Sequence, residues 1–166
     1  MDVPVDLDDV ALLEGGALSA SKPPLLHDEE VAVAVWRGGA LGAILSIWHD
    51  PDDEEEPFAQ EITVFELVNG VWTWRSTGGC DWPVDYGERL AYKTPVFTGT
   101  GASLPSPDGR GLICLSTGIA PPGVERVRVE HEGLEAEADV EPVTGAFLVA
   151  LPAWPNPLTK VSSVFP

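Results

Sequence analysis

Basic residues are scarce in this sequence. Nine lysines and arginines stand against 27 aspartates and glutamates in 166 residues, which gives a formal net charge of −18. Nucleic-acid binding depends on lysine and arginine to neutralise phosphates, and anionic membrane surfaces attract basic segments. The charge balance therefore argues against both as partners. It favours a soluble or salt-adapted surface, or attraction to a basic protein or a cation.

Cysteine and histidine are also rare, with two and three residues. Cys80 and Cys114 do not amount to a disulfide framework or a zinc site, and His27, His49 and His131 are not spaced as metal ligands. We expect Cys114, which lies in an apolar stretch, to be a small buried hydrophobe. We expect His131 to be a polar residue at a hairpin tip. The sequence predicts no metal site and no cofactor.

No apolar run is long enough to cross a bilayer without interruption. Val31–His49 comes closest, but Arg37 and Gly38-Gly39 interrupt it and both flanks are acidic. We interpret it as a hairpin that turns at Gly38-Gly39. The N-terminal stretch MDVPVDLDDV has no basic region before an apolar run, so the sequence predicts no secretory signal and a cytoplasmic setting.

The longest clear pattern is Leu112–Leu151, which predicts four strands. Around Glu132-Gly133, apolar and charged residues alternate with period two, as in a hairpin with one buried face. That turn predicts four cross-strand pairs: Val129 with Ala136, Val127 with Ala138, Arg128 with Glu137, and Arg126 with Asp139. Leu112–Ala120 and Ala146–Leu151 are apolar on both faces, which is typical of interior strands.

A second hairpin is predicted at Asn69-Gly70, the strongest turn signal in the chain. It places Leu67 opposite Trp72 and Phe65 opposite Trp74, an aromatic cross-strand ladder on one face.

The two ends of the chain hold further elements. Thr159–Phe165 is expected to be an edge strand. Helical signals are confined to the arm 1–30, where Asp6 caps a short helix over Leu7–Glu14 that must pack on a sheet to be stable.

The fold class follows from these elements. Eight or nine strands with little helix, and 44% hydrophobic residues, predict one all-β domain over residues 1–166. The expected architecture is an antiparallel β-sandwich, either immunoglobulin-like or a partly open barrel.

One segment departs from the strand pattern. Thr77–Gly111 contains seven glycines and four prolines. We expect a long loop there, with Leu90–Thr98 as a weak strand candidate.

Two loops hold the candidate binding residues. In the long loop, aromatic rings beside hydrogen-bonding acids and a base would stack on a sugar or clamp a cationic side chain: Trp82, Asp85, Tyr86 and Arg89. The alternative is that Trp82 folds back as a plug over the end of the sandwich. The second loop has seven acids between Asp50 and Glu61, next to the aromatic hairpin. Its central residues are expected to attract a basic partner: Asp52, Asp53, Glu54 and Glu55.

The leading functional hypothesis is a non-enzymatic module that binds a basic protein, of the immunity, inhibitor or adaptor type. One alternative is a small-molecule or carbohydrate-binding module that uses the loop aromatics. Another is a hydrolase whose acids cannot be recognised from their spacing, since acids are abundant everywhere. Cys80 is a poor nucleophile because Asp81, Asp85 and Glu88 disfavour its thiolate.

We predict no tight calcium site at Asp50–Glu61. Acids occupy loop positions 1, 3, 5 and 12, but the sixth position, where an EF-hand loop needs glycine, is Glu55. Calorimetry at physiological salt should detect no stoichiometric sub-micromolar binding. A tight site that Asp52→Asn abolishes would contradict this prediction.

Overall fold

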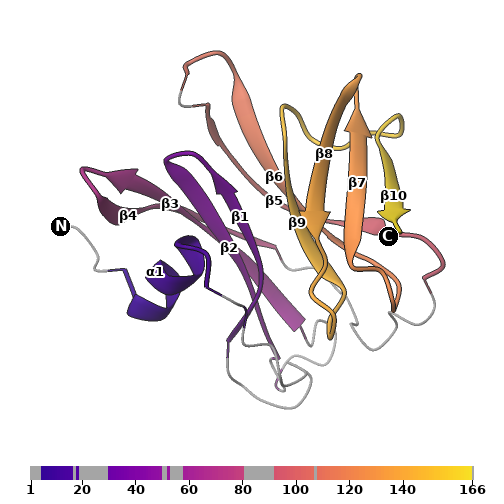
Figure 1. Ribbon diagram of the computed structural model, residues 1–166, viewed down its shortest axis with the longest axis horizontal. Coiled ribbons are helices and arrows are strands. Elements are labelled where there is room, and N and C mark those ends of the chain that lie inside the picture. The colour runs from indigo at the N-terminus through magenta and orange to yellow at the C-terminus, as the bar shows by residue number, and fades with distance from the viewer. Residues whose placement is uncertain are drawn as a thin grey trace.

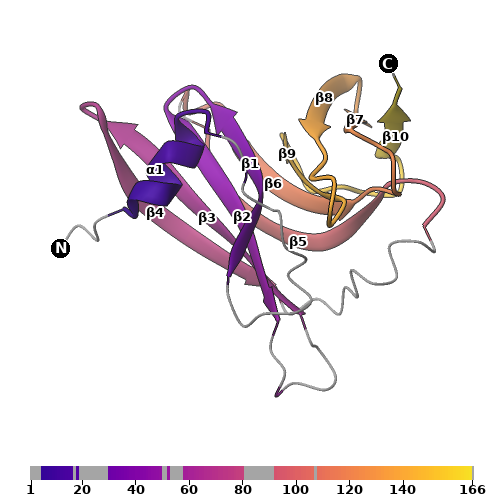
Figure 2. The same ribbon diagram turned by 60° about the horizontal axis from the view of Figure 1, so that its bottom comes forward.

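The computed structural model describes residues 5–16, 18, 30–49, 52, 58–80, 92–106 and 108–165. Within these residues the chain is mostly β, with one short helix and several antiparallel sheets, as predicted. The ten strands exceed the eight or nine that the sequence suggested. Figures 1 and 2 show three sheets, with the helix α1 against the outer face of the first.

The first sheet is a four-stranded meander in the order β1-β2-β3-β4. Its strands are β1 (Val31–Gly38), β2 (Leu41–His49), β3 (Phe58–Val68) and β4 (Val71–Cys80). The first hairpin turns at Gly39-Ala40, one residue later than predicted, because Gly38 pairs with Leu41.

The β3–β4 hairpin confirms the predicted register. Asn69 and Gly70 have φ of 51° and 81°, the left-handed values that a tight hairpin turn needs. Leu67 lies opposite Trp72 and Phe65 opposite Trp74. A bulge between Val64 and Phe65 then shifts the register. The extra residue is Arg75 on β4, and β3 alternates without interruption, so Val64 faces the core and Phe65 faces α1.

The other two sheets have three strands each. The central sheet has the order β5-β6-β9 and consists of β5 (Val96–Pro105), β6 (Leu112–Ile119) and β9 (Ala146–Leu151). The third sheet has the order β10-β7-β8 and consists of β7 (Arg126–His131), β8 (Leu134–Asp139) and β10 (Lys160–Val164). The predicted edge strand at the C-terminal end is thus confirmed as β10.

The central sheet is buried on both faces. One core lies between it and the first sheet and contains Leu115, Ile119 and Leu148 with Leu45 and Ile62. A second core lies between the opposite face and the third sheet: Phe147, Val149, Leu151, Val127 and Val129. Successive side chains of β9 therefore enter different cores. This explains why Ala146–Leu151 is apolar at every position, although, among the described residues, β9 pairs with β6 alone.

The β7–β8 hairpin has the register that the sequence predicted. Val127 pairs with Ala138, and Val129 pairs with Ala136. On the solvent face, Arg126 Nε lies 3.1 Å from Asp139 Oδ1, and Arg128 Nη2 lies 2.8 Å from Glu137 Oε1. These exposed ion pairs contribute about 0–1 kcal/mol each.

His131 differs from its prediction. It is buried, at 1% exposure, and its Nδ1 lies 2.8 Å from Thr159 Oγ1. The alternation of Val127 and Val129 continues to His131 as the last residue of β7, which places its ring on the inner face.

Cys114 is buried as predicted, and this burial raises the pKa of its thiol.

The helix α1 (Leu7–Leu13) ends one residue before the predicted boundary. Asp6 caps it, since Asp6 Oδ1 accepts a hydrogen bond of 2.8 Å from the backbone N–H of Asp8. Leu13 packs against Ile44 and Phe65 on the outer face of the first sheet. A seven-residue helix is not stable alone, so this contact is what keeps it folded.

The predicted loop Thr77–Gly111 is wrong at its start and in its second half, whereas residues 108–111, at its end, form turns and bends as expected. Thr77–Cys80 continues β4, and Val96–Pro105 forms β5. The glycines permit close approach between these strands: a Cβ at Gly78 would lie 2.9 Å from the carbonyl oxygen of Gly101. The glycine content thus reflects strand packing in these segments. Residues 81–91 and 107 lie outside the described residues.

We expect Gly78→Ala to destabilise the fold by about 1–3 kcal/mol, because the new methyl group would push β4 away from β5. The backbone of Gly78 is not left-handed, so crowding alone would cause this loss. Denaturant unfolding measures it. Ser103→Ala, an exposed position on β5, is the control and should change stability by less than about 0.5 kcal/mol. A Gly78→Ala protein as stable as the wild type would contradict this account.

Candidate functional site

Most of the predicted binding residues lie outside the part of the chain that the structure describes: Trp82, Asp85, Tyr86, Arg89, Asp53, Glu54 and Glu55. Asp52 is described, in a turn, and is exposed. The predictions for both loops therefore remain predictions. The described residues offer three other features that bear on function: a cleft, an acidic cluster and an exposed apolar hairpin.

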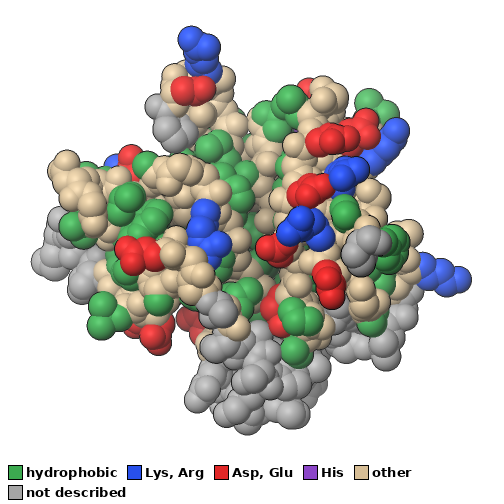
Figure 3. Space-filling model, in the orientation of Figure 1, with side chains coloured by type: hydrophobic (Ala, Val, Ile, Leu, Met, Phe, Trp, Pro, Cys, Tyr) green, Lys and Arg blue, Asp and Glu red, His purple; other side chains and the backbone are tan. Residues whose placement is uncertain are grey.

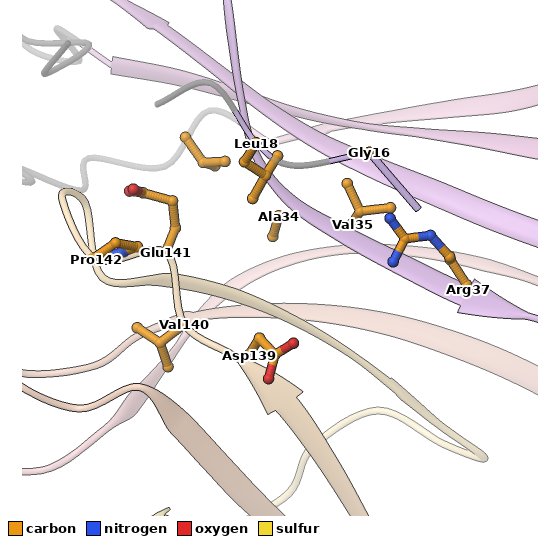
Figure 4. Close-up of a pocket in the computed structure, with 10 residues that line it drawn as sticks. Gly16, Leu18, Ala34, Val35, Arg37, Asp139, Val140, Glu141 and Pro142 are labelled. Carbon is orange, nitrogen blue, oxygen red and sulfur yellow. The ribbon is translucent and has the colours of Figure 1, made fainter. Parts of the chain in front are cut away.

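The cleft lies between β1 and the segment that follows β8, and has a volume of about 470 Å³. Figure 3 shows the molecule hollowed between the first sheet and the third. Figure 4 shows Arg37 on the β1 side and Asp139 with Glu141 on the opposite side. Apolar residues from both sides, such as Val35 and Val140, line the space between them. Its size falls in the range of small-molecule sites.

The charged groups around this cleft already have partners. Arg37 Nε donates to the carbonyl oxygens of Leu12 and Leu13, both at 3.2 Å, and so neutralises the C-terminal end of α1. Asp139 is paired with Arg126.

Glu141 is 4% exposed and has both carboxylate oxygens engaged. Its Oε1 accepts from the backbone N–H of Val143 at 3.0 Å, and its Oε2 accepts from both the backbone N–H and the hydroxyl of Thr144 at 2.6 Å. This carboxylate therefore holds the turn before β9, and the cleft does not present a carboxylate available for acid–base chemistry among the residues described.

An acidic cluster lies at the start of α1. Burial, together with repulsion from Asp6, Glu30 and Asp8, raises the pKa of the Asp9 carboxyl. Asp6, Asp8 and Asp9 are close in the sequence, whereas Glu30 is brought to them by the fold. Sequence reasoning treated the N-terminal arm only as a helix signal and missed this cluster. Mutual repulsion of this kind is relieved when a cation approaches.

The β3–β4 hairpin exposes apolar side chains. Leu67 and Val68 are 37% exposed, Val71 is 65% exposed and Trp74 is 45% exposed. Trp72 is half-buried beside α1. The hairpin thus presents one exposed and one half-buried tryptophan. Trp74 Nε1 donates to Thr77 Oγ1 at 3.0 Å, which orients the indole ring.

Searches for other kinds of site were negative over the described residues. They contain no group of three or more His, Cys, Asp or Glu residues arranged to hold a metal ion. In this same part of the chain no helix has the length and hydrophobicity to cross a membrane. No family model, curated protein or solved structure matches the chain.

We expect Asp9→Asn to stabilise the protein at neutral pH. The folded state holds the Asp9 proton more tightly than the unfolded state does, so stability falls as pH rises from the ordinary value of 3.8 through the raised pKa of the folded protein. The stabilisation of Asp9→Asn should therefore be complete at about pH 7 and disappear below about pH 3.8. Urea unfolding across this range measures it.

Asp108→Asn is the control, because it should change the stability of the fold in the opposite direction. Hydrogen bonds from the Arg110 backbone and Ser106 lower the pKa of the Asp108 carboxyl, so its ionised form stabilises the fold above its ordinary value of 3.8. This variant should be less stable than the wild type at neutral pH. If both variants change stability in the same direction, repulsion within the α1 cluster is not the cause.

Proposed function

We propose that this protein is a non-enzymatic interaction module whose partner is a basic protein. The observation that carries the proposal is the acidic cluster of Asp6, Asp8, Asp9 and Glu30, in a chain of net charge −18. Carboxylates that repel one another in the free protein gain favourable interactions when a basic surface covers them. Binding to such a surface is therefore favoured over binding to a neutral one.

Long-range attraction would act before contact. A concentrated negative field accelerates encounter with a basic protein, and salt weakens it because the screening length falls from about 30 Å at 0.01 M to about 8 Å at physiological ionic strength. The acids between Asp50 and Glu61 would add to this field. The proposal includes them on sequence grounds, together with a cytoplasmic setting. Immunity proteins, inhibitors and adaptors are the functional types that fit.

The hydrolase alternative receives less support. The carboxylate of Glu141 in the cleft is fully hydrogen-bonded to its own turn, and Asp139 is paired with Arg126. The carbohydrate alternative depends on Trp82 and Tyr86, outside the described residues, and no feature of the cleft favours it.

Reversal of charge tests the proposal. We expect lysine at positions Asp52, Asp53, Glu54 and Glu55 to slow association with the native partner by about tenfold or more at low salt, because the local field is lost. The partner is first recovered from the native lysate with the wild-type protein, and association rates are then measured from about 10 mM to about 150 mM salt.

The control reverses four exposed acids on the third sheet and its turns: Glu125, Glu130, Glu132 and Glu135. It changes the net charge equally, so it separates a local docking surface from the overall field. A smaller effect of the control supports local docking. A partner whose association rate is insensitive to salt and to both reversals rules out the proposed function.

A further inference from the structure

The β3–β4 hairpin concentrates exposed apolar surface at one edge of the first sheet. Leu67, Val68, Val71 and Trp74 are four of the exposed large hydrophobic residues, and all lie within eight consecutive positions. Within the described residues, β4 forms its ladder with β3 alone. Leu67 and Trp74 share the outer face of the hairpin, whereas Val68 and Val71 lie on its other face. Exposed apolar groups at a sheet edge, in a highly charged protein, are typical of an interaction surface.

The hairpin is also rigid. The Asn69-Gly70 turn has the geometry that matches strand twist, and the backbone N–H of Leu67 donates to Ala40 O at 2.7 Å, which ties β3 to the neighbouring turn. The ring of Trp74 is oriented by Thr77 Oγ1. On the hairpin's other face, Arg75 forms an ion pair with Glu66. A preorganised aromatic side chain loses little entropy on binding.

Negative charge lies beside this surface. The helix α1 packs against β1 and β2, and Figure 2 shows its first turn on the side of the first sheet where β4 lies. That turn carries Asp8 and Asp9, and Asp6 caps it. Figure 3 shows acidic and hydrophobic side chains intermixed over α1 and next to the β3–β4 hairpin. The surface therefore combines an exposed indole with carboxylates.

We propose that the outer face of the β3–β4 hairpin docks an arginine-bearing segment of the basic partner, with the guanidinium group stacked on Trp74. This inference rests on the proposed function and identifies where the partner makes its central contact. Tryptophan is the best aromatic partner for a cation, and the planar guanidinium stacks while its N–H groups remain available to carboxylates. The apolar neighbour Leu67, on the same face as Trp74, would pack against the aliphatic part of the segment.

The net charge of the chain favours an arginine-bearing segment over a second copy of the chain at this surface. Two copies would each bring a net charge of −18 to the same contact, which disfavours self-association at this acidic surface. A basic segment would instead neutralise the first turn of α1. Tryptophan and arginine are also the residues most enriched among those that dominate binding energy at protein interfaces.

The test uses two synthetic octapeptides at low salt, one of alternating arginine and valine and one of alternating lysine and valine. Their affinities for the intact protein are measured by calorimetry. We expect the arginine peptide to bind more tightly than the lysine peptide. Trp74→Leu should weaken arginine-peptide binding by about 2- to 30-fold, the range that cation–π energies imply, and Trp74→Phe should retain part of the affinity.

Trp154→Leu is the matched control, since Trp154 is 47% exposed and lies against Gly101 in the central sheet. It should leave both affinities unchanged. Circular dichroism and thermal unfolding of each variant exclude loss of fold as the cause. Equal losses in Trp74→Leu and Trp154→Leu, or equal binding of the two peptides, would overturn the stacking proposal.

Two further outcomes identify other occupants. If a peptide of alternating glutamine and valine binds as tightly as the arginine peptide, the surface is only apolar and the inference fails. If sedimentation shows that the wild type self-associates and Trp74→Leu does not, the occupant is a second copy and the inference again fails. Intact partner binding by Trp74→Leu, with sensitivity to the acidic reversals retained, would overturn this inference alone and leave the proposed function standing.

Discussion

The structure depends on the burial of the central sheet between two others. β9 places side chains in both cores and β6 in the first, and Phe147, Leu115 and Ile119 are fully buried. A side chain of this size contributes about 1.5–3 kcal/mol when it is transferred from water, so a few such residues match the net stability of a typical domain. The first and third sheets each leave one face free for polar or functional residues because their other face covers this central layer.

The free faces differ in character. On the third sheet, two arginines pair with two acids across β7 and β8, while Glu130 and Glu135 remain exposed on the same strands. On the first sheet, α1 covers only part of the outer face, around Ile44 and Phe65. The part beyond the helix keeps Trp74 exposed. The two free faces are therefore chemically distinct, since, among the described residues, only the first sheet exposes a large aromatic side chain there.

Turn chemistry made much of the fold predictable. Asn69-Gly70 and Glu132-Gly133 adopt the left-handed conformations expected of them, and a two-residue turn with period-two alternation leaves a single reasonable register. The helix was equally accessible, because a capping aspartate, an apolar stripe and a terminal glycine are local signals. Where glycine serves packing between strands, as at Gly78 and Gly101, the same residue type suggested a loop. The strand candidate Leu90–Thr98 therefore overlapped β5 only at its last three residues.

The sequence by itself determined most of the strands, the two hairpin registers and the strongly acidic character, since alternation, turn residues and charge are properties of short segments. Only the tertiary structure decided which sheets face each other, that His131 is buried against Thr159, and that the charged groups of the cleft are engaged by their own neighbours. It also brought Glu30 to the acids of α1, and α1 to the edge of the aromatic hairpin. These contacts join segments that are distant in the sequence, and their geometry depends on how complete faces pack, which no local pattern encodes.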